Sequence, residues 1–354
     1  MQRLAQRRHF FKAAAALGLA SSRAGSLLAA TDLPIADSHS HLGTVSRKPG
    51  GRSLKAEMEA SGVMLLAWSI VGDTQWTKHT PLGIEQKSVP AGGEQAGYFR
   101  KRLALVREHL ASIDLPYVRD TSDVDAARSG SPRIVIAIEG AGAAGDGLEL
   151  LDESHAQGLR HVQLVHYIRN ALGDFQTEAP QHNGLTQLGA DVVRACNRLG
   201  MLVDLAHSTG AVIDKALEIS KAPVIWSHSD ITTAQYDWRQ TTSRSRLLHL
   251  DYAKKIAAGG GAVGLWNLRS SVGNSPRGYT DELLRMVDAI GPDHVMFGTD
   301  MNGVGPYGTM SELNDLREVA ELLGRRGIDD KTLRAICFEN YARCLQAAMS
   351  ARQP

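Results

Sequence analysis

The sequence has little cysteine and almost no net charge, and each shortage excludes a class of protein. Only three cysteines occur in 354 residues. They form no C-x-x-C pair, so neither a disulfide framework nor a thiolate metal site is expected. Cys337 and Cys344, if they share a helix, are separated by about 10 Å of helical rise, too far for a disulfide bond. A formal net charge of +1, with scattered Lys and Arg, argues against a nucleic-acid-binding protein, which would carry a clustered basic face.

A serine nucleophile elbow is also missing. No G-x-S-x-G motif occurs, so a hydrolase with a Ser/His/Asp triad on such an elbow is set aside. Hydrophobic residues make up 43% of the chain, which is enough to fill a large core. The thirteen histidines are therefore the most suggestive chemical resource.

The first thirty residues have the features of an export signal. The segment 6–12 (QRRHFFK) resembles a twin-arginine motif, and the apolar stretch Ala13–Ala20 that follows is too short to cross a bilayer comfortably. Small residues at Ser26–Ala30 offer a processing site. A lipoprotein is not expected, because it would need a cysteine near this site and none is present. We expect a signal peptide over residues 1–30, a single domain over residues 31–354, and delivery by the twin-arginine machinery to the periplasm or beyond, with no stable membrane insertion after processing.

Short apolar runs then alternate with amphipathic stretches. The expected strands are Leu33–Ala36, Met64–Ile70, Ile134–Ile138, His161–Leu164, Leu202–Asp204, Val224–Trp226, Ala262–Leu265 and His294–Phe297. The expected helices between them include Glu94–Ile113, Thr186–Leu199, Thr209–Ser220, Asp251–Ala258 and Thr280–Ala289. This alternation predicts an α/β fold, a (β/α)8 TIM barrel, with an open doubly wound sheet as the alternative.

Three connections are longer than a barrel scaffold needs: Val71–Gly93, Ser229–His249 and Asn267–Gly278. Each follows an expected strand and would therefore lie at the C-terminal face, where barrel enzymes keep their active sites. We expect these connections to form the substrate pocket.

Metal-ligand side chains stand at the ends of several expected strands. His39 and His41 follow the first strand, and residues two apart in an extended segment point to the same side. Other candidates end later strands: Glu139, His207, His228 and Asp300. The barrel would bring them to one rim, so we expect a metal site there. Imidazole and carboxylate ligands without sulfur suit Zn²⁺, with Mn²⁺ or Fe²⁺ as alternatives.

These residues fall within blocks that resemble the membrane (renal) dipeptidase family of zinc metallopeptidases. The blocks are IAIEG at 136–140, QLVH at 163–166, GLT at 184–186, NRLGMLVDLAH at 197–207, SHS at 227–229 and GTD at 298–300. The resemblance implies a dipeptidase with two Zn²⁺ ions, or one. His39 and His41 would hold one ion, His207 and His228 the other, and Glu139 would bridge them. Asp300 would be the catalytic acid/base, and His166 would contact the substrate at its scissile carbonyl.

The chain departs from the family pattern at two places. His41 stands where the family usually has Asp, which makes the first metal site more positive by one charge. The segment Trp266–Leu268 replaces an Asn-Phe-Tyr-like segment, so the pocket wall is changed. The arginine that would bind the substrate carboxylate stays open among Arg239, Arg244 and Arg246.

The sequence also allows other functions. The segment Gly140–Gly145 fits G-x-G-x-x-G, but the following strand ends in His166 rather than an acidic residue, so a Gly/Ala-rich barrel loop is favoured over a dinucleotide site. An amidohydrolase acting on a lactone, cyclic amide or N-acyl amino acid is the nearer alternative. A catalytically inactive periplasmic metal-binding module is the alternative of another class, and a homodimer is left open.

Overall fold

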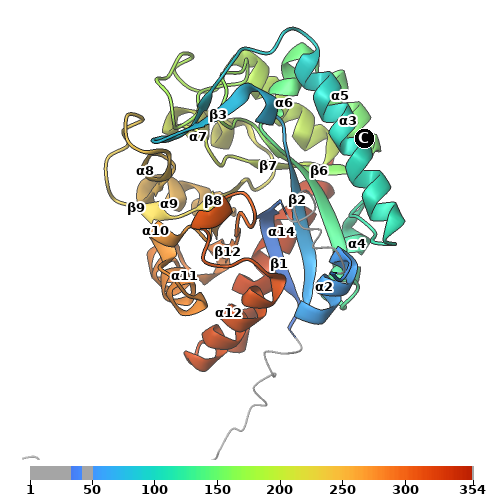
Figure 1. The fold of residues 1–354 in the computed structure, drawn as a ribbon, viewed down its shortest axis with the longest axis vertical. Coiled ribbons are helices and arrows are strands. Elements are labelled where there is room, and N and C mark those ends of the chain that lie inside the picture. The colour runs from blue at the N-terminus through green and yellow to red at the C-terminus, as the bar shows by residue number, and fades with distance from the viewer. Residues whose placement is uncertain (1–32, 42–50, 353–354) are drawn as a thin grey trace, which may run out of the picture.

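The computed structural model describes residues 33–41 and 51–352. Eight parallel strands form one sheet in the order β1-β2-β5-β6-β7-β8-β11-β12, with helices around it (Figure 1). The strands are β1 (Ile35–Ser40), β2 (Val63–Val71), β5 (Arg133–Glu139), β6 (Leu159–Gln163), β7 (Leu202–Asp204), β8 (Ile225–Ser229), β11 (Ala262–Leu265) and β12 (Val295–Phe297). All eight expected strands are present, so the (β/α)8 prediction is confirmed and the open doubly wound sheet is excluded.

The first and last strands meet at the C-terminal rim. Ser40 pairs with Met301 in an isolated parallel bridge, and the His41 N–H donates to the Met301 carbonyl at 2.9 Å. Deeper in the barrel, the Ser38 hydroxyl donates to the Phe297 carbonyl at 2.8 Å. These contacts nearly close the barrel, and they place the H-x-H segment beside the loop that carries Asp300.

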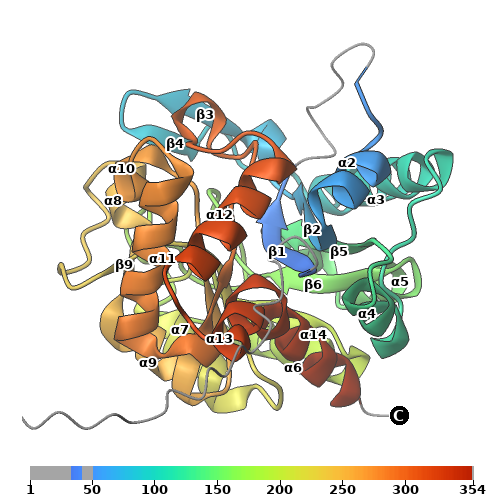
Figure 2. The ribbon, with the colours of Figure 1, turned by 90° about the horizontal axis from the view of Figure 1, so that it is seen from below.

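Helix α6 begins and ends at clear capping residues. Thr186 caps the α6 helix by accepting from the Gly189 N–H, and Gly200 ends it in the left-handed conformation, with φ of 76°. Such caps satisfy backbone groups that have no partner within the helix. The helices between or after the strands are α2 (Leu54–Ser61), α3 (Glu94–Ser112), α4 (Thr121–Arg128), α5 (Glu149–Ala156), α6 (Gln187–Leu199), α7 (Gly210–Ile219), α9 (Leu250–Ala258), α11 (Pro276–Ile290), α12 (Leu313–Arg325) and α13 (Asp330–Arg334). Helices α11 and α12 lie side by side (Figure 2).

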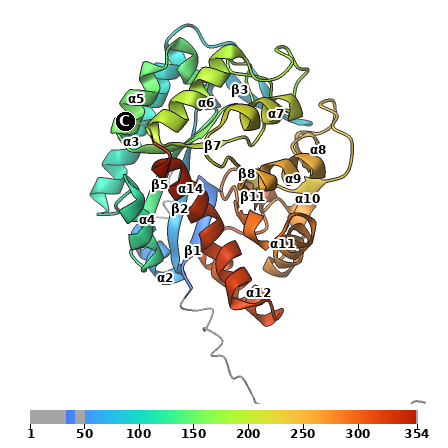
Figure 3. The same ribbon diagram turned by 180° about the vertical axis from the view of Figure 1, so that it is seen from behind.

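The C-terminal helix α14 (Asn340–Ser350) covers the opposite end of the barrel (Figure 3). It follows a π-helical turn, Ala335–Glu339, whose Phe338 is buried. Phe338, Tyr341 and Leu345 pack in one cluster with residues near the starts of several strands, among them Ala36 and Leu202. This apolar cluster fills the N-terminal end of the barrel.

The three long connections carry small elements of their own. The first holds the hairpin of β3 (Thr77–Thr80) and β4 (Gly83–Gln86), the second holds β9 (Ile231–Thr232), α8 (Thr242–Ser245) and β10 (Leu248–His249), and the third holds α10 (Arg269–Val272). The first two touch, because the Thr242 N–H donates to the Leu82 carbonyl at 2.9 Å. The glycine-rich segment after β5 forms a short 3-10 helix, Ala141–Asp146, in the βα connection of a barrel.

The expected signal peptide, residues 1–30, lies outside the described residues. Among residues 33–41 and 51–352, no helix combines the length and apolar composition that a membrane crossing requires. The three cysteines are buried free thiols.

Candidate metal centre

Seven ligand-type side chains converge at the C-terminal rim. Each stands at or just beyond the end of a different strand, except that His39 and His41 share β1, and all are at most 8% exposed. They are His39, His41, Glu139, His166, His207, His228 and Asp300. The structure thus brings together every metal and catalytic candidate named from the sequence.

Glu139 is the hub of this cluster. Its Oε1 atom lies 3.2 Å from Nε2 of His207, 3.3 Å from Nε2 of His166, and 3.5 Å from Nε2 of both His39 and His228. Its Oε2 atom lies 3.4 Å from Nε2 of His41. Because five imidazoles turn the same ring nitrogen toward one carboxylate, the arrangement suits a shared ligand between two ions.

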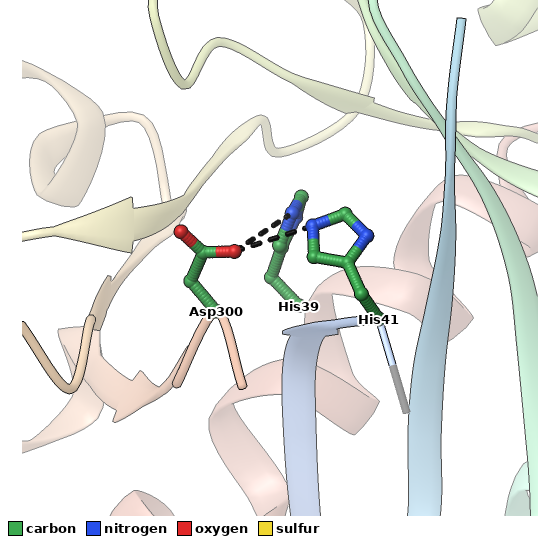
Figure 4. Close-up of side chains that lie close together, drawn as sticks. All are labelled: His39, His41 and Asp300. Carbon is green, nitrogen blue, oxygen red and sulfur yellow. Dashed lines mark ion pairs between the residues drawn. The ribbon is translucent and has the colours of Figure 1, made fainter. Parts of the chain in front are cut away.

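Asp300 forms a second group with the two histidines of β1. Figure 4 shows its carboxylate facing both rings, with Oδ1 at 3.2 Å from Nε2 of His41 and 4.0 Å from Nε2 of His39. One ligand atom from each residue lies within 4.8 Å of the other two. Asp300 is therefore placed to bind a metal as well as to carry a proton.

Two of the site residues have a strained backbone. His207 has φ of 70° and Asp300 has φ of 53°, in the left-handed region that residues with a side chain rarely adopt. Such strain costs about 1–3 kcal/mol per residue and is found preferentially at functional sites. Each lies three residues beyond a strand end, His207 after Asp204 of β7 and Asp300 after Phe297 of β12.

The electrostatics favour ligand-ready protonation states. Burial alone would raise the pKa of Glu139, but the imidazoles around it, His166 and His39 foremost, hold it well below its usual value. Burial, reinforced by nearby Arg246, holds the pKa of His207 well below its usual value; burial and nearby His39 do the same for His228. A deprotonated carboxylate and neutral imidazoles are the forms that bind metals.

His41 behaves differently from these two histidines. Burial would lower the pKa of His41, but the Asp300 and Glu139 carboxylates outweigh it and raise it to about 9. The His41 imidazole thus lies between two carboxylates, with Nε2 at 3.4 Å from Oε2 of Glu139 and 3.2 Å from Oδ1 of Asp300.

His166 is held by an acidic residue that the sequence analysis did not single out. Its Nδ1 atom lies 2.7 Å from Oδ1 of Asp73, and the other oxygen of Asp73 accepts from the Tyr167 N–H at 3.0 Å. Burial lowers the pKa of His166, but Asp73 and Glu139 outweigh it and keep the pKa above its usual value. Asp73 follows β2 by two residues, so the rule that located the other candidates at strand ends would also have found it.

The donor set fits a metal ion. The Nε2 atom of His39 is buried and has no hydrogen-bond partner, although it faces Glu139 across 3.5 Å. Burying such a polar atom unpaired is costly unless something else satisfies it. Nitrogen and oxygen donors without sulfur match Zn²⁺, Mn²⁺ or Fe²⁺.

The three candidate arginines lie in different surroundings. Arg239 is exposed, pairs with Asp237 at 3.3 Å and stacks on Trp238. Arg244 is exposed and lines a cavity of about 330 Å³ beside α7, with Tyr236 and Tyr252 also in its walls.

Arg246 alone of the three is buried, at 2% exposure. Its Nη1 donates to the Tyr167 hydroxyl at 2.9 Å, and its guanidinium lies over the rings of Tyr167 and Trp266. Its Nε and Nη2 atoms have no partner. The Tyr167 ring in turn contacts the His207 ring, at 4.9 Å between centroids. A buried guanidinium with two nitrogen atoms that lack hydrogen-bond partners thus lies next to the cluster of candidate metal ligands.

The fold and the cluster together define a (β/α)8 protein with a candidate metal centre on its catalytic face. The model of the membrane dipeptidase family, peptidase family M19, matches residues 24–354. The chain belongs to this family.

Individual relatives agree with that assignment. The chain is 31% identical over 242 residues to the dipeptidase verJ of Clonostachys rogersoniana, covering 66% of this chain and 60% of that protein. It is 30% identical over 226 residues to the dipeptidase tcpJ of Claviceps purpurea, covering 62% of this chain and 52% of that one. The match therefore spans only about half to three fifths of these relatives.

Solved structures share the fold. The dipeptidase AC, a metallopeptidase of family M19, superposes with a TM-score of 0.73 at 22% identity, over 90% of this chain and 99% of that one. A metallopeptidase from Rhodobacter sphaeroides, liganded with a phosphinate mimic of the dipeptide L-Ala-D-Ala, gives 0.72 at 21% identity, with the same coverage.

Proposed function

We propose that this protein is a zinc-dependent dipeptidase that hydrolyses the amide bond of dipeptides with a free C-terminal carboxylate. The observation that carries this proposal is the pairing of two features at one rim. One is the cluster of imidazoles around Glu139, and the other is the buried guanidinium of Arg246, two of whose nitrogen atoms have no partner. Membership of the M19 family and the dipeptidase relatives support it.

Each residue has a proposed place around the metal. His39 and His41, with Asp300 beside them, would hold one ion, and His207 and His228 would hold the other, with Glu139 common to both. A bound zinc ion lowers the pKa of its water toward neutrality and polarises a carbonyl group, as amide hydrolysis requires.

Two side chains are proposed to handle protons and charge. Asp300 would take the proton of the attacking water and deliver it to the leaving amine. His166, held by Asp73 with its pKa above the usual value, would donate a hydrogen bond to the substrate oxygen on which negative charge develops.

Arg246 is the arginine that we propose for the substrate carboxylate. A guanidinium can bind a carboxylate through two parallel hydrogen bonds, and Arg246 has donors to spare. Arg239 and Arg244 are exposed to solvent, where a single charge pair contributes little.

The test is a library of mixed dipeptides, with C-terminally free and amidated members, assayed with the zinc-loaded protein. Free dipeptides should be cleaved and amidated ones spared. Equal cleavage of both would show that no arginine binds the substrate carboxylate. It would favour an amidohydrolase acting on a cyclic amide or N-acyl amino acid. Cleavage of lactones alone would favour a lactonase. If the protein binds metal but cleaves none of these substrates, the result would favour a catalytically inactive metal-binding module.

We also propose export. The twin-arginine motif of residues 6–12 supports a signal peptide over residues 1–30 ahead of a single catalytic domain. The twin-arginine pathway carries folded proteins, which suits an enzyme that is loaded with metal before it leaves the cytoplasm.

A further inference from the structure

One hydroxyl group stands between two of the candidate metal ligands. The Oγ atom of Ser227 lies 2.8 Å from Nδ1 of His228 and 3.2 Å from Nδ1 of His39. The two imidazole rings are stacked at a tilt, with 3.8 Å between their centroids. His39 belongs to the group with His41 and Asp300, while His228 lies against His207, with 3.3 Å between their Nε2 atoms. Ser227 therefore contacts one histidine of each group, on the ring nitrogen that faces away from Glu139.

Ser227 is held rigidly by hydrogen bonds from both sides. It is completely buried. Its N–H donates to Oδ1 of Asp204 at 3.0 Å, and its carbonyl accepts from the Ser38 hydroxyl at 2.9 Å. Asp204 is itself fixed, because its other oxygen lies 3.1 Å from Nε2 of His161. Contacts with β1 and β7 thus fix the backbone that carries this oxygen atom.

Two glycines let the neighbouring strands approach Ser227 closely. A Cβ atom added at Gly264 would lie 1.9 Å from the Ser227 carbonyl oxygen, and one added at Gly298 would lie 1.7 Å from it. Both contacts are with backbone, which cannot swing aside as a long side chain can. A side chain at either position would therefore force the Ser227 backbone or the substituted segment to move.

The chemistry of an imidazole ligand gives this contact a purpose. The Nε2 atoms of His39 and His228 both face Glu139. A ring that binds a metal through Nε2 carries its proton on Nδ1, and that N–H needs an acceptor that fixes the tautomer and the ring orientation. A serine oxygen has two lone pairs and can accept hydrogen bonds from two such N–H groups at once.

We infer that Ser227 is a positioning residue that orients His39 and His228 together and so couples the two metal subsites of the proposed dipeptidase. The inference rests on the proposed metal-dependent function. Ser69 provides a contrast within the same site. Its Oγ lies 3.2 Å from Nδ1 of His39, and no hydrogen bond joins its side chain to His228 among the described residues.

The experiment measures zinc affinity directly rather than activity. Metal-free protein is titrated with Zn²⁺ in competition with a chromophoric chelator, which resolves the binding steps. Four variants are compared with the wild type: Ser227→Ala, Ser227→Thr, Ser69→Ala and Ser40→Ala. Ser40 is the matched control, because it is a buried serine of β1 whose hydroxyl donates to the Ala67 carbonyl at 2.8 Å.

Ser227→Ala should weaken both zinc-binding steps by roughly 10–100-fold, the usual effect of losing a partner behind a metal ligand. Ser69→Ala should weaken one step, Ser40→Ala neither, and Ser227→Thr should keep most of the affinity because it keeps the hydroxyl. Thermal melting of the metal-free variants checks that each is folded. Should Ser227→Ala fail to fold, Ser227→Gly, which also lacks the hydroxyl and adds no metal ligand, takes its place.

Three results would overturn the inference. They are unchanged affinity in Ser227→Ala, a loss confined to one step, and a loss equal to that of Ser40→Ala. A single zinc-binding step in the wild type would also overturn the coupling. Wild-type protein that binds no zinc at all would instead refute the proposed zinc-dependent function, so the two failures are distinguishable.

Discussion

Oδ1 of Asp300 lies 3.2 Å from Nε2 of His41, within the reach of a shared metal ion or a shared proton. The proposed acid/base is thus placed as a third ligand as well, in keeping with its position among the ligand-type side chains that end the strands.

Asp300→Asn tests the proton-transfer role of this residue. The amide keeps the shape of the side chain but cannot accept a proton, so kcat should fall by roughly 10²–10⁴-fold. Metal content should fall less than in Glu139→Gln, which removes the shared carboxylate. Near-wild-type turnover of dipeptides in Asp300→Asn would show that another group transfers the proton.

Removal of the metal should both inactivate and destabilise the protein. A chelator is expected to abolish hydrolysis and to lower Tm, because an ion that binds only the folded state adds free energy of unfolding in proportion to the logarithm of its concentration over Kd. Added Zn²⁺ should restore both properties. Full activity in protein that metal analysis shows to be metal-free would refute the proposed mechanism.

Replacing Arg246 tests recognition of the substrate carboxylate. Arg246→Met should raise KM for free dipeptides by roughly 10–100-fold, since a hydrogen bond to a charged group contributes about 1.5–3 kcal/mol. Arg239→Met is the matched control and should leave KM unchanged, because that side chain is 72% exposed. Similar KM values for the two variants would assign the carboxylate to another group.

The pH dependence of stability should carry a contribution from His155, outside the site. Burial, together with nearby Arg160 and Arg352, lowers its pKa from the usual 6.5 to about 4. Below pH 6.5 the unfolded chain takes up a proton that the folded chain refuses, so stability should fall between pH 6.5 and 4. Tm should therefore drop less in His155→Gln than in the wild type between pH 7.5 and 5. An equal drop would contradict the prediction.

Export can be tested through the paired arginines. Arg7→Lys combined with Arg8→Lys should retain the protein in the cytoplasm, whereas the wild type should appear in the periplasm or beyond, shortened near residue 30. Fractionation followed by mass spectrometry distinguishes the two. Undiminished export of the double variant would point to another route.

The sequence predicted the barrel well because strand ends and ligand residues follow local rules. Glu139 and His228 stand where a buried strand ends, and a (β/α)8 barrel brings the C-terminal ends of its strands to one rim. The first strand was predicted too short, since it runs to Ser40 rather than Ala36, its polar residues being buried by contacts with distant strands.

Longer-range relationships could not be predicted in this way. Arg246 is distinguished from Arg239 and Arg244 only by Tyr167 and Trp266, which come from two other connections and cover its side chain. The role inferred for Ser227 likewise depends on two imidazoles from strands far apart in the sequence. Contacts between residues far apart in the chain produce no periodic pattern in a single sequence, so neither the burial of Arg246 nor the contacts of Ser227 could be predicted.

The bridge between Ser40 and Met301 has a consequence for the timing of synthesis. His41 leaves the ribosome early, but Asp300 follows only after most of the chain has been made, on the order of tens of seconds later at ordinary elongation rates. Until then the histidines of β1 lack their neighbour, and a nascent chain can offer a metal only an incomplete site. Ribosome-bound fragments that end before β12 should therefore hold zinc weakly, and tight loading should begin only once translation is nearly finished.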